Sequence, residues 1–363
     1  MRIGKTRTAR TAAAVAALAL GALTLTACGD SDSAASGDRL RLGYFPNLTH
    51  ASALVGLEKG YLQSALGDTE LTTQQFNAGS SAIEALNAGA IDASYIGPNP
   101  AINGFVKSKG DALRIVSGAT SGGAAFVVQP GINGAADLDG TIVASPQLGN
   151  TQDVALRHWL DEQGLETNVS GKGDVEIQST ENATILQLFR DKKIEGAWVP
   201  EPWASRLVTE GGGKVLVDEA TLWPRGEFVT THVIVRKAYL DEHPEQVKAL
   251  LEGHVKANDW INANPDEAKT LVNAELEELT GKALKPAALD RAWGELTITL
   301  DPIASSLITS AEHGVSVGVT DEASLKGIYD LSILNGILKA AGEDEVSDNG
   351  YGQGASSPAP DKS

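Results

Sequence analysis

Strand-like and helix-like segments alternate along this chain from residue 39 onward, and this alternation limits the folds it can adopt. Residues 39–45 alternate in polarity as a β-strand does, and residues 51–62 space their apolar side chains as a helix does. Further pairs of the same kind follow up to about residue 128. Strands and helices in alternation predict an α/β fold in which helices flank a mostly parallel sheet.

The alternation restarts after residue 140, and the second series matches the first in places. Residues 91–96 (IDASYI) align without a gap on residues 194–199 (IEGAWV). The chain has 363 residues, more than the roughly 150 of one average domain, so we expect two lobes of similar architecture. The β-rich run 227–237 predicts a return to the first lobe, and the two crossovers would leave a hinge and a cleft between the lobes.

Composition and periodicity divide the chain into six expected segments. They are a signal peptide (1–27), a small, polar and acidic tether (28–38), the first part of lobe one (39–128), lobe two (129–227), the remainder of lobe one with the return strand and C-terminal helices (228–342), and a disordered tail (343–363). In the C-terminal part, helical spacing is expected over residues 241–264, 266–281, 286–296 and 321–341.

The first 28 residues indicate the compartment. Arg2, Lys5, Arg7 and Arg10 form a basic start, and an uncharged, alanine-rich stretch follows that is short for a membrane span. Residues 25–28 (LTAC) resemble a bacterial lipobox and end at Cys28, the only cysteine of the chain. We therefore predict a lipidated Cys28 that anchors the protein to the outer face of the cell membrane. The alternative is an ordinary secretory signal beside an incidental cysteine.

Charge and cysteine content exclude several function classes. The chain has 47 acidic residues and 29 Lys and Arg, a net charge of −18, which argues against nucleic-acid binding because phosphate recognition needs a basic face. A single cysteine excludes a disulfide framework, a four-cysteine zinc site and an iron–sulfur cluster. The six histidines show neither H-x-x-x-H nor H-E-x-x-H spacing, so we expect no metal and no cofactor.

The loops after the strands of the first lobe are the expected ligand-facing segments, because ligands of open α/β sheets bind beyond the carboxyl ends of strands. Residues 45–50, 77–81, 97–99 and 118–123 contain no formal charge and are rich in hydroxyls, amides and glycine. Residues 79–84 combine a glycine with a capping-box pattern, and residues 149–151 (GNT) repeat the arrangement in the second lobe. Exposed helix starts of this kind bind anions, although simple helix capping explains the same residues.

The corresponding loops of the second lobe carry charge. Trp198 and Trp203 bracket Glu201, and an aromatic wall with a carboxylate can hold an organic amine. Arg225 could instead pair with an anion. The alternative interpretation makes Trp198 a core residue and Glu201 the cap of the next helix.

A hydrolase-like motif also occurs. Residues 314–318 (GVSVG) satisfy G-x-S-x-G, but a nucleophile elbow follows a strand, and the preceding segment has helical spacing. No phosphate-binding G-x-x-x-x-G-K-[ST] loop is present. We therefore expect a protein that is not an enzyme. A thiamine-precursor-synthesis type of enzyme shares this fold class, but it would need a catalytic Cys or His cluster, and the sequence shows none.

Several of these segments together resemble a known family. Residues 79–92, Gly97 with Pro98, residues 137–153 and residues 199–203 (VPEPW) are similar to the nitrate/sulfonate/taurine-type substrate-binding proteins of ABC transporters. The resemblance covers about residues 39–340. It implies a two-lobe, type II periplasmic-binding-protein-like clamshell, a monomer that works outside the cytoplasm and a permease as partner.

The resemblance also implies the ligand class and the site. The family binds alkanesulfonates, taurine, nitrate, bicarbonate and thiamine-pyrimidine precursors, and the uncharged loops of the first lobe favour an aliphatic sulfonate. A cell-surface lipoprotein that binds or senses another protein is the more distant alternative. The residues that match pocket-facing loops are Asn47, Ser80, Ser81, Asn99, Thr120, Ser121, Asn150, Thr151, Asn182 and Glu201.

Overall fold

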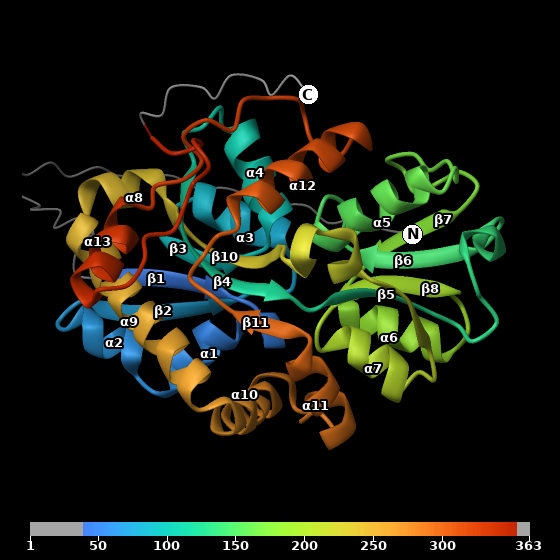
Figure 1. The fold of residues 1–363 in the computed structure, drawn as a ribbon, viewed down its shortest axis with the longest axis horizontal. Coiled ribbons are helices and arrows are strands. Elements are labelled where there is room, and N and C mark those ends of the chain that lie inside the picture. The colour runs from blue at the N-terminus through green and yellow to red at the C-terminus, as the bar shows by residue number, and fades with distance from the viewer. Residues whose placement is uncertain (1–38, 354–363) are drawn as a thin grey trace, which may run out of the picture. The chain divides into compact units, whose positions relative to one another are not determined.

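Two α/β lobes, each built on its own β-sheet, make up residues 39–353, which are the residues that the computed structural model describes (Figure 1). The first lobe has a 6-stranded sheet with the order β11 (Leu296–Ile298), β4 (Leu113–Gly122), β10 (Val229–Arg236), β3 (Ala93–Ile96), β1 (Arg39–Tyr44) and β2 (Glu70–Gln75). The second lobe has a 5-stranded sheet with the order β7 (Glu176–Thr180), β6 (Ile142–Pro146), β8 (Gly196–Pro200), β5 (Ala124–Val128) and β9 (Lys214–Asp218).

The direction of the strands differs in part from expectation. β1 pairs in parallel with β2 and β3, and β6 pairs in parallel with β7 and β8. By contrast, β10 is antiparallel to β3 and β4, β11 to β4, and β5 to β8 and β9. The predicted two-lobe α/β fold is confirmed, but its sheets are mixed. The chain enters the second lobe through β5 and returns to the first lobe through β10. Each of these two strands starts at the cleft and runs away from it, whereas the strands beside it run toward the cleft.

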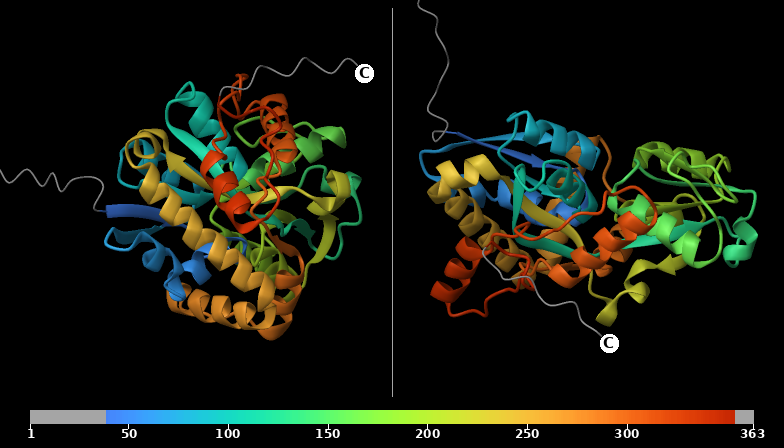
Figure 2. Two further views of the ribbon diagram at one scale, coloured as in Figure 1. Left: turned by 60° about the vertical axis from the view of Figure 1, so that its left-hand side comes forward. Right: turned by 90° about the horizontal axis from the view of Figure 1, so that it is seen from above.

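Helices cover both faces of each sheet (Figure 2). The helices between strands are α1 (Ala51–Glu58), α2 (Tyr61–Leu66), α3 (Gly79–Asn87) and α4 (Pro98–Lys107) in the first lobe, and α5 (Thr151–Glu162), α6 (Asn182–Arg190) and α7 (Trp203–Thr209) in the second. The C-terminal helices are α8 (Lys237–Glu242), α9 (Pro244–Ala263), α10 (Pro265–Thr280), α11 (Pro286–Gly294), α12 (Ala304–Ser316) and α13 (Ser332–Ala341). The GVSVG motif ends α12, so a helix and not a strand precedes Ser316.

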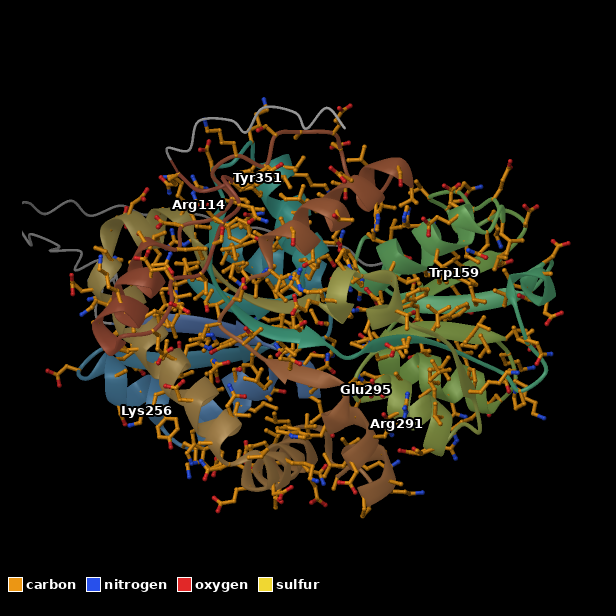
Figure 3. The ribbon with its side chains drawn as sticks, in the orientation of Figure 1. Arg114, Trp159, Lys256, Arg291, Glu295 and Tyr351 are labelled. Carbon is orange, nitrogen blue, oxygen red and sulfur yellow. The ribbon has the colours of Figure 1, made fainter. Side chains whose placement is uncertain are left out.

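Successive residues of β5 show how the second lobe forms its core. Phe126 and Val128 pack in a cluster with Trp159 of α5, which Figure 3 labels, whereas Val127 packs on the other face with Phe189 of α6. The Phe126 ring also stacks on Trp198, with ring centroids 5.5 Å apart. Alternate side chains of a strand point to opposite faces, so a strand buried on both sides is apolar throughout.

The chain first crosses between the lobes at Gly122 and Gly123, which join β4 to β5. Their φ angles are +79° and +75°, a conformation that glycine adopts without steric cost. Because β5 belongs to the second sheet, the expectation that lobe one extends to residue 128 is wrong. β4 (LRIVSGATSG) and β5 (AAFVV) follow one another with only glycine at the join, and both read as strands, so the sequence pattern does not mark a change of sheet. The second crossing lies beside the first, since the Gly122 N–H donates to the Phe228 carbonyl at 3.1 Å.

The C-terminal segment is more ordered than expected. The tail was expected to be disordered from residue 343, but residues 343–353 pack on the first lobe. Val346 exchanges two hydrogen bonds with the Asn335 side chain, at 2.9 and 3.0 Å, and Gly352 forms a parallel bridge with Tyr329. Tyr351, labelled in Figure 3, joins the first-lobe core. The helix expected over 321–341 is also shorter, because it begins only at Ser332 in α13.

The expected signal peptide, Cys28 and the tether lie outside the described residues, as do residues 354–363. Within residues 39–353, no helix has both the length and the apolar character needed to cross a membrane.

Candidate ligand-binding site

A small cavity of about 60 Å³ lies between the two lobes, where the carboxyl ends of their strands meet. The first lobe contributes Phe45, Asn47, Thr49, His50, Asn77, Ala78, Gly79, Gly97, Pro100 and Thr230 to its lining. The second lobe contributes Pro146, Asn150, Thr151, Gln152, Asn182 and Pro200. A ligand in this cavity would therefore contact both lobes at once.

Four helices begin at the cavity, two from each lobe. α3 begins at Gly79, α4 follows Gly97, α5 begins at Thr151 and α6 begins at Asn182. In the described structure, no side chain caps the first turn of any of these four helices by a hydrogen bond. The first N–H groups of a helix have no partner within it, and the helix dipole places partial positive charge there. Their convergence favours an anion.

The side chains around the cavity are neutral. Its lining contains no Asp, Glu, Lys or Arg. Burial lowers the pKa of His50 to about 3, so this imidazole is uncharged at neutral pH, and its Nδ1 accepts from the Phe45 N–H at 3.4 Å. Hydroxyls, amides and backbone dipoles must therefore hold whatever enters. A neutral cage of this kind can bind and release an anion without breaking a buried ion pair.

Two glycines allow the lobes to approach one another here. A Cβ placed on Gly97 would lie 2.6 Å from Thr151 Oγ1, on the opposite lobe. A Cβ on Gly79 would lie 2.2 Å from Pro100 Cγ, within the first lobe, and 3.0 Å from Asn150 Oδ1, across the cleft. These distances are shorter than van der Waals contact, so only glycine lets the starts of α3, α4 and α5 come this close.

Hydrogen bonds also span the lobes beside the cavity. The Ser80 hydroxyl donates to Gln147 Oε1 at 3.1 Å, and Trp203 Nε1–H donates to Asn47 Oδ1 at 3.0 Å. The lobes are thus in contact around the cavity, as in a closed clamshell.

Comparison with known proteins identifies the family. A family model described as the NMT1-like family matches residues 33–275 of the chain. The chain belongs to the NMT1-like family. This agrees with the predicted resemblance to the substrate-binding proteins of ABC transporters, and the relatives of this NMT1-like protein are themselves binding proteins.

Two relatives and one solved structure illustrate the likeness. A protein of Brucella abortus (strain 2308), named as a binding protein, is 26% identical over 256 residues, which cover 68% of this chain and 76% of that one. The taurine-binding periplasmic protein of Escherichia coli (strain K12) is 28% identical over 196 residues, 53% of this chain and 58% of that one. The alkanesulfonate-binding protein SsuA from Xanthomonas axonopodis pv. citri, solved bound to MOPS, has 20% identity and a TM-score of 0.66. That match covers 78% of this chain and 95% of SsuA, and it shows the fold.

Four of the ten residues expected to face the ligand line the cavity of this NMT1-like protein: Asn47, Asn150, Thr151 and Asn182. Ser80 and Ser81 do not. Ser80 contacts the other lobe at the edge of the cleft, and Ser81 is exposed on α3.

Asn99, Thr120 and Ser121 are buried but bonded elsewhere. Asn99 exchanges hydrogen bonds with Ser310 of α12, at 3.0 and 3.1 Å. The Thr120 hydroxyl donates to the Thr49 carbonyl at 2.7 Å, and the Ser121 hydroxyl accepts from the Phe228 N–H at 3.3 Å. All three lie at or just after the ends of strands, as expected. Their side chains, however, form hydrogen bonds within the first lobe.

Glu201 is a helix cap rather than a ligand-facing residue. Its carboxyl group is 1% exposed and accepts from the backbone N–H and the hydroxyl of Ser205, at 3.0 and 2.9 Å. Burial raises its pKa to about 7. Trp198 is fully buried and donates to Glu219 at 2.7 Å, while Arg225 is exposed and pairs with Glu227. The capping and core interpretation is therefore correct for Glu201 and Trp198.

The structure adds polar lining residues beyond the ten expected ones: Thr49, His50, Asn77, Gln152 and Thr230. The first three fall within the polar loops quoted above, and Gln152 follows the predicted helix start. Thr230 lies inside strand β10, where an uninterrupted β pattern gave no sign of a site.

Proposed function

We propose that this protein is the solute-binding component of an ABC importer, which captures a small organic anion outside the cytoplasm and delivers it to a permease. The observation that carries the proposal is the convergence of four helix starts from both lobes on a cavity with no charged side chain. The helix starts carry partial positive charge, and no charged side chain of the lining neutralises it. Such a site suits reversible capture of an anion. An aliphatic sulfonate is the ligand we propose.

The size of the cavity supports a small anionic head group. About 60 Å³ gives room for roughly four to six water-sized atoms, and a sulfonate head has one sulfur and three oxygens. The three oxygens spread the charge over directions that several helix starts can reach. The relatives named for taurine and alkanesulfonates support the same class.

Binding is coupled to closure in this proposal. The ligand contacts both lobes only when they approach, so it favours the closed arrangement by the difference in its affinity for the two forms. We expect a monomer, with the closed face around both lobes presented to the permease.

Titration calorimetry tests the proposal directly. The purified protein is unfolded and refolded to remove any carried-over ligand, and then titrated with ethanesulfonate, taurine, nitrate, bicarbonate and an aminopyrimidine. We expect one-to-one saturable binding of a sulfonate. A refolded protein that responds to none of these solutes would contradict the proposal.

A bare oxyanion such as nitrate or bicarbonate is the second candidate. The observation in its favour is again the small cavity, which holds an anion of four atoms without a substituent. The same titration separates the two, because a bare oxyanion would then bind more tightly than any sulfonate.

We also propose that Cys28 is lipidated and anchors the protein outside the cell membrane, on the strength of the lipobox-like residues 25–28. Mass spectrometry of the mature N-terminus should find a diacylated cysteine. A mature N-terminus without acyl chains on Cys28 would contradict the anchor.

A further inference from the structure

A cavity of about 470 Å³ lies on the first lobe, away from the cleft between the lobes. The C-terminal end of α4, the start of β4 and the loop after α12 enclose it. β4 ends at Gly122, where the chain crosses to the second lobe, whereas Arg114 is the second residue of that strand. Eight residues of strand span roughly 26 Å, so this cavity, called the distal cavity below, is separate from the cavity in the cleft.

Three cations line the distal cavity: Lys109, Arg114 and Lys326. Asp111 is the single carboxylate of the lining. The chain as a whole has 47 acidic residues against 29 Lys and Arg, so an excess of cations at one cavity runs against its overall charge. None of the three cations forms an ion pair within residues 39–353. The lining therefore favours an anion.

Arg114, which Figure 3 labels, is one of two arginines that are buried in the described structure. The other, Arg157, pairs with Asp153 at 2.9 Å, as a buried charge normally does. Arg114 is only 7% exposed, and its Nη1 donates to the carbonyls of Gly110 and Leu113, at 2.6 Å each. Carbonyl groups carry no formal charge, so this guanidinium lacks a counterion.

One nitrogen of the Arg114 guanidinium remains available to a ligand. Nη2 forms no hydrogen bond within the described residues, and it is not one of the side-chain atoms that are enclosed without a partner. It can therefore donate to a molecule in the cavity, whereas Nε is enclosed and cannot. The Phe105 ring, with its centroid 5.6 Å from Cζ, helps to hold the guanidinium in this position.

The surrounding protein does not neutralise this charge. Burial lowers the pKa of Arg114, and the carboxylates of Asp241, Asp330 and Asp111 act in the opposite direction without outweighing burial. Asp241 and Asp330 also have closer partners of their own. An anion in the distal cavity would supply the missing counterion.

We propose that the distal cavity binds a phosphate group, to which Arg114 Nη2 donates while Lys109 and Lys326 supply positive charge. A tetrahedral phosphate presents oxygens in several directions, so it can meet more cations at once than a planar carboxylate with two oxygens. The site does not depend on the proposed function, because no residue of the distal cavity lines the cavity in the cleft.

Lipid head groups and free phosphate compounds share this chemistry. β10 is antiparallel to β4 and to β3, and β3 is parallel to β1, so β1 and β4 start at the same edge of the sheet. Arg39, the first residue of β1, therefore lies at the same edge as Arg114. A lipidated Cys28, as proposed above, would keep this edge within about 40 Å of a membrane, because eleven residues extend no further. A lipid phosphate is thus within reach.

Calorimetry on the full chain tests the site with two probes: inorganic phosphate and glycerophosphoglycerol, the water-soluble head group of phosphatidylglycerol. We expect one-to-one binding of at least one probe. Lys109→Gln and Lys326→Gln, both at exposed positions, should each weaken it about fivefold, and Arg114→Gln should weaken it further. Lys339→Gln, at an exposed position on α13, is the matched control and should bind as the wild type does. The lysine variants keep the test decisive if Arg114→Gln does not fold.

A cleft variant separates this site from the cavity between the lobes, which also suits anions. Asn150→Asp adds a negative charge at the start of α5, more than a Debye length away, and should leave the phosphate response unchanged. A response that is lost in Asn150→Asp and kept in the double variant Lys109→Gln/Lys326→Gln overturns the distal site.

The two probes also distinguish the sources of the phosphate. Tighter binding of glycerophosphoglycerol supports a lipid head group, and tighter binding of inorganic phosphate supports a free phosphate compound. Binding of neither probe overturns the site, and sulfonate binding in the same preparation would show that the proposed function still holds.

Discussion

Glycine at position 97 determines how closely the two lobes approach at the ligand cavity. Its φ of −71° lies in a region open to every residue, so the backbone does not demand glycine. The requirement comes from Thr151 on the other lobe, whose hydroxyl lies 2.6 Å from the place of a Cβ. Within the first lobe, the Thr230 carbonyl oxygen would lie 3.7 Å from the Cβ, an ordinary contact, so the close approach is to the other lobe.

The variant Gly97→Val should therefore lose ligand affinity while its melting temperature stays close to that of the wild type. Overpacking typically costs about 1–3 kcal/mol, which corresponds to a loss of affinity of roughly five- to 150-fold. Calorimetry and thermal denaturation measure the two effects separately. Gly336→Ala, on α13 with open space around the new methyl group, is the control and should leave affinity unchanged. A Gly97→Val protein that binds normally would show that the lobes do not close as described.

At the level of secondary-structure elements, α5 and α12 join the lobes through two histidines. The rings of His158 and His313 stack with centroids 3.5 Å apart, and Trp223 lies 5.8 Å from His313. Burial, with a smaller contribution from His158, lowers the pKa of His313 to about 4. A carboxylate also faces the pair, since Glu162 Oε1 lies 3.6 Å from His158 Nε2. This contact between the lobes therefore contains a group that titrates.

Ligand affinity should fall as the pH decreases from about 6.5 to 4. A histidine in water has a pKa near 6.5, so His313 takes up a proton at a higher pH when the α5–α12 contact is open than when it is closed. As the pH falls, protonation therefore stabilises the open form relative to the closed form. The full affinity is present above pH 6.5. Replacement of His313 by Gln should flatten this part of the profile, although His50 in the cavity still contributes in the same direction. Identical profiles for the wild type and His313→Gln between pH 6.5 and 4 would contradict the coupling.

The sequence predicts elements better than it predicts what their side chains face. Glycine and polar residues before apolar helical spacing placed the starts of α3 and α5 closely, but the capping-box pattern did not hold, because no side chain caps the first turn of either helix. Asn99, Ser121 and Glu201 stand at equivalent local positions, yet they bond to α12, Phe228 and Ser205. Which partner a side chain meets depends on tertiary packing, and the same holds for Thr230, which reaches the cavity only because β10 returns from the other lobe.

At the scale of the whole molecule, an ion-pair network joins the two lobes. Glu210 of the second lobe binds Arg206 on its own lobe and Lys282 on the first, and its side chain is only 5% exposed. Burial opposes its ionisation, but hydrogen bonds from Arg206 and Lys282 hold its pKa below the ordinary value. The carboxylate therefore remains charged and bridges the lobes at neutral pH.

Glu210→Gln should lower ligand affinity about fivefold, because the closed form loses a charge-assisted bridge worth on the order of 1 kcal/mol. The wild type should also bind less tightly at high salt than at low salt, and the variant should show a smaller salt effect. Glu252→Gln is the matched control, since Glu252 pairs with Lys248 within α9 and touches one lobe only. Equal salt dependence in wild type and Glu210→Gln would contradict a role in closure.

The two crossings between the lobes lie side by side, joined by the hydrogen bond from Gly122 to Phe228. A single linker permits swivelling as well as bending, whereas two adjacent strands bonded to each other resist torsion and leave bending as the soft degree of freedom. Successive capture cycles would then follow one path, and both lobes would reach a membrane partner in the same relative orientation each time. The membrane partner would then detect whether the cavity is occupied from the distance between the surfaces of the two lobes, without touching the ligand.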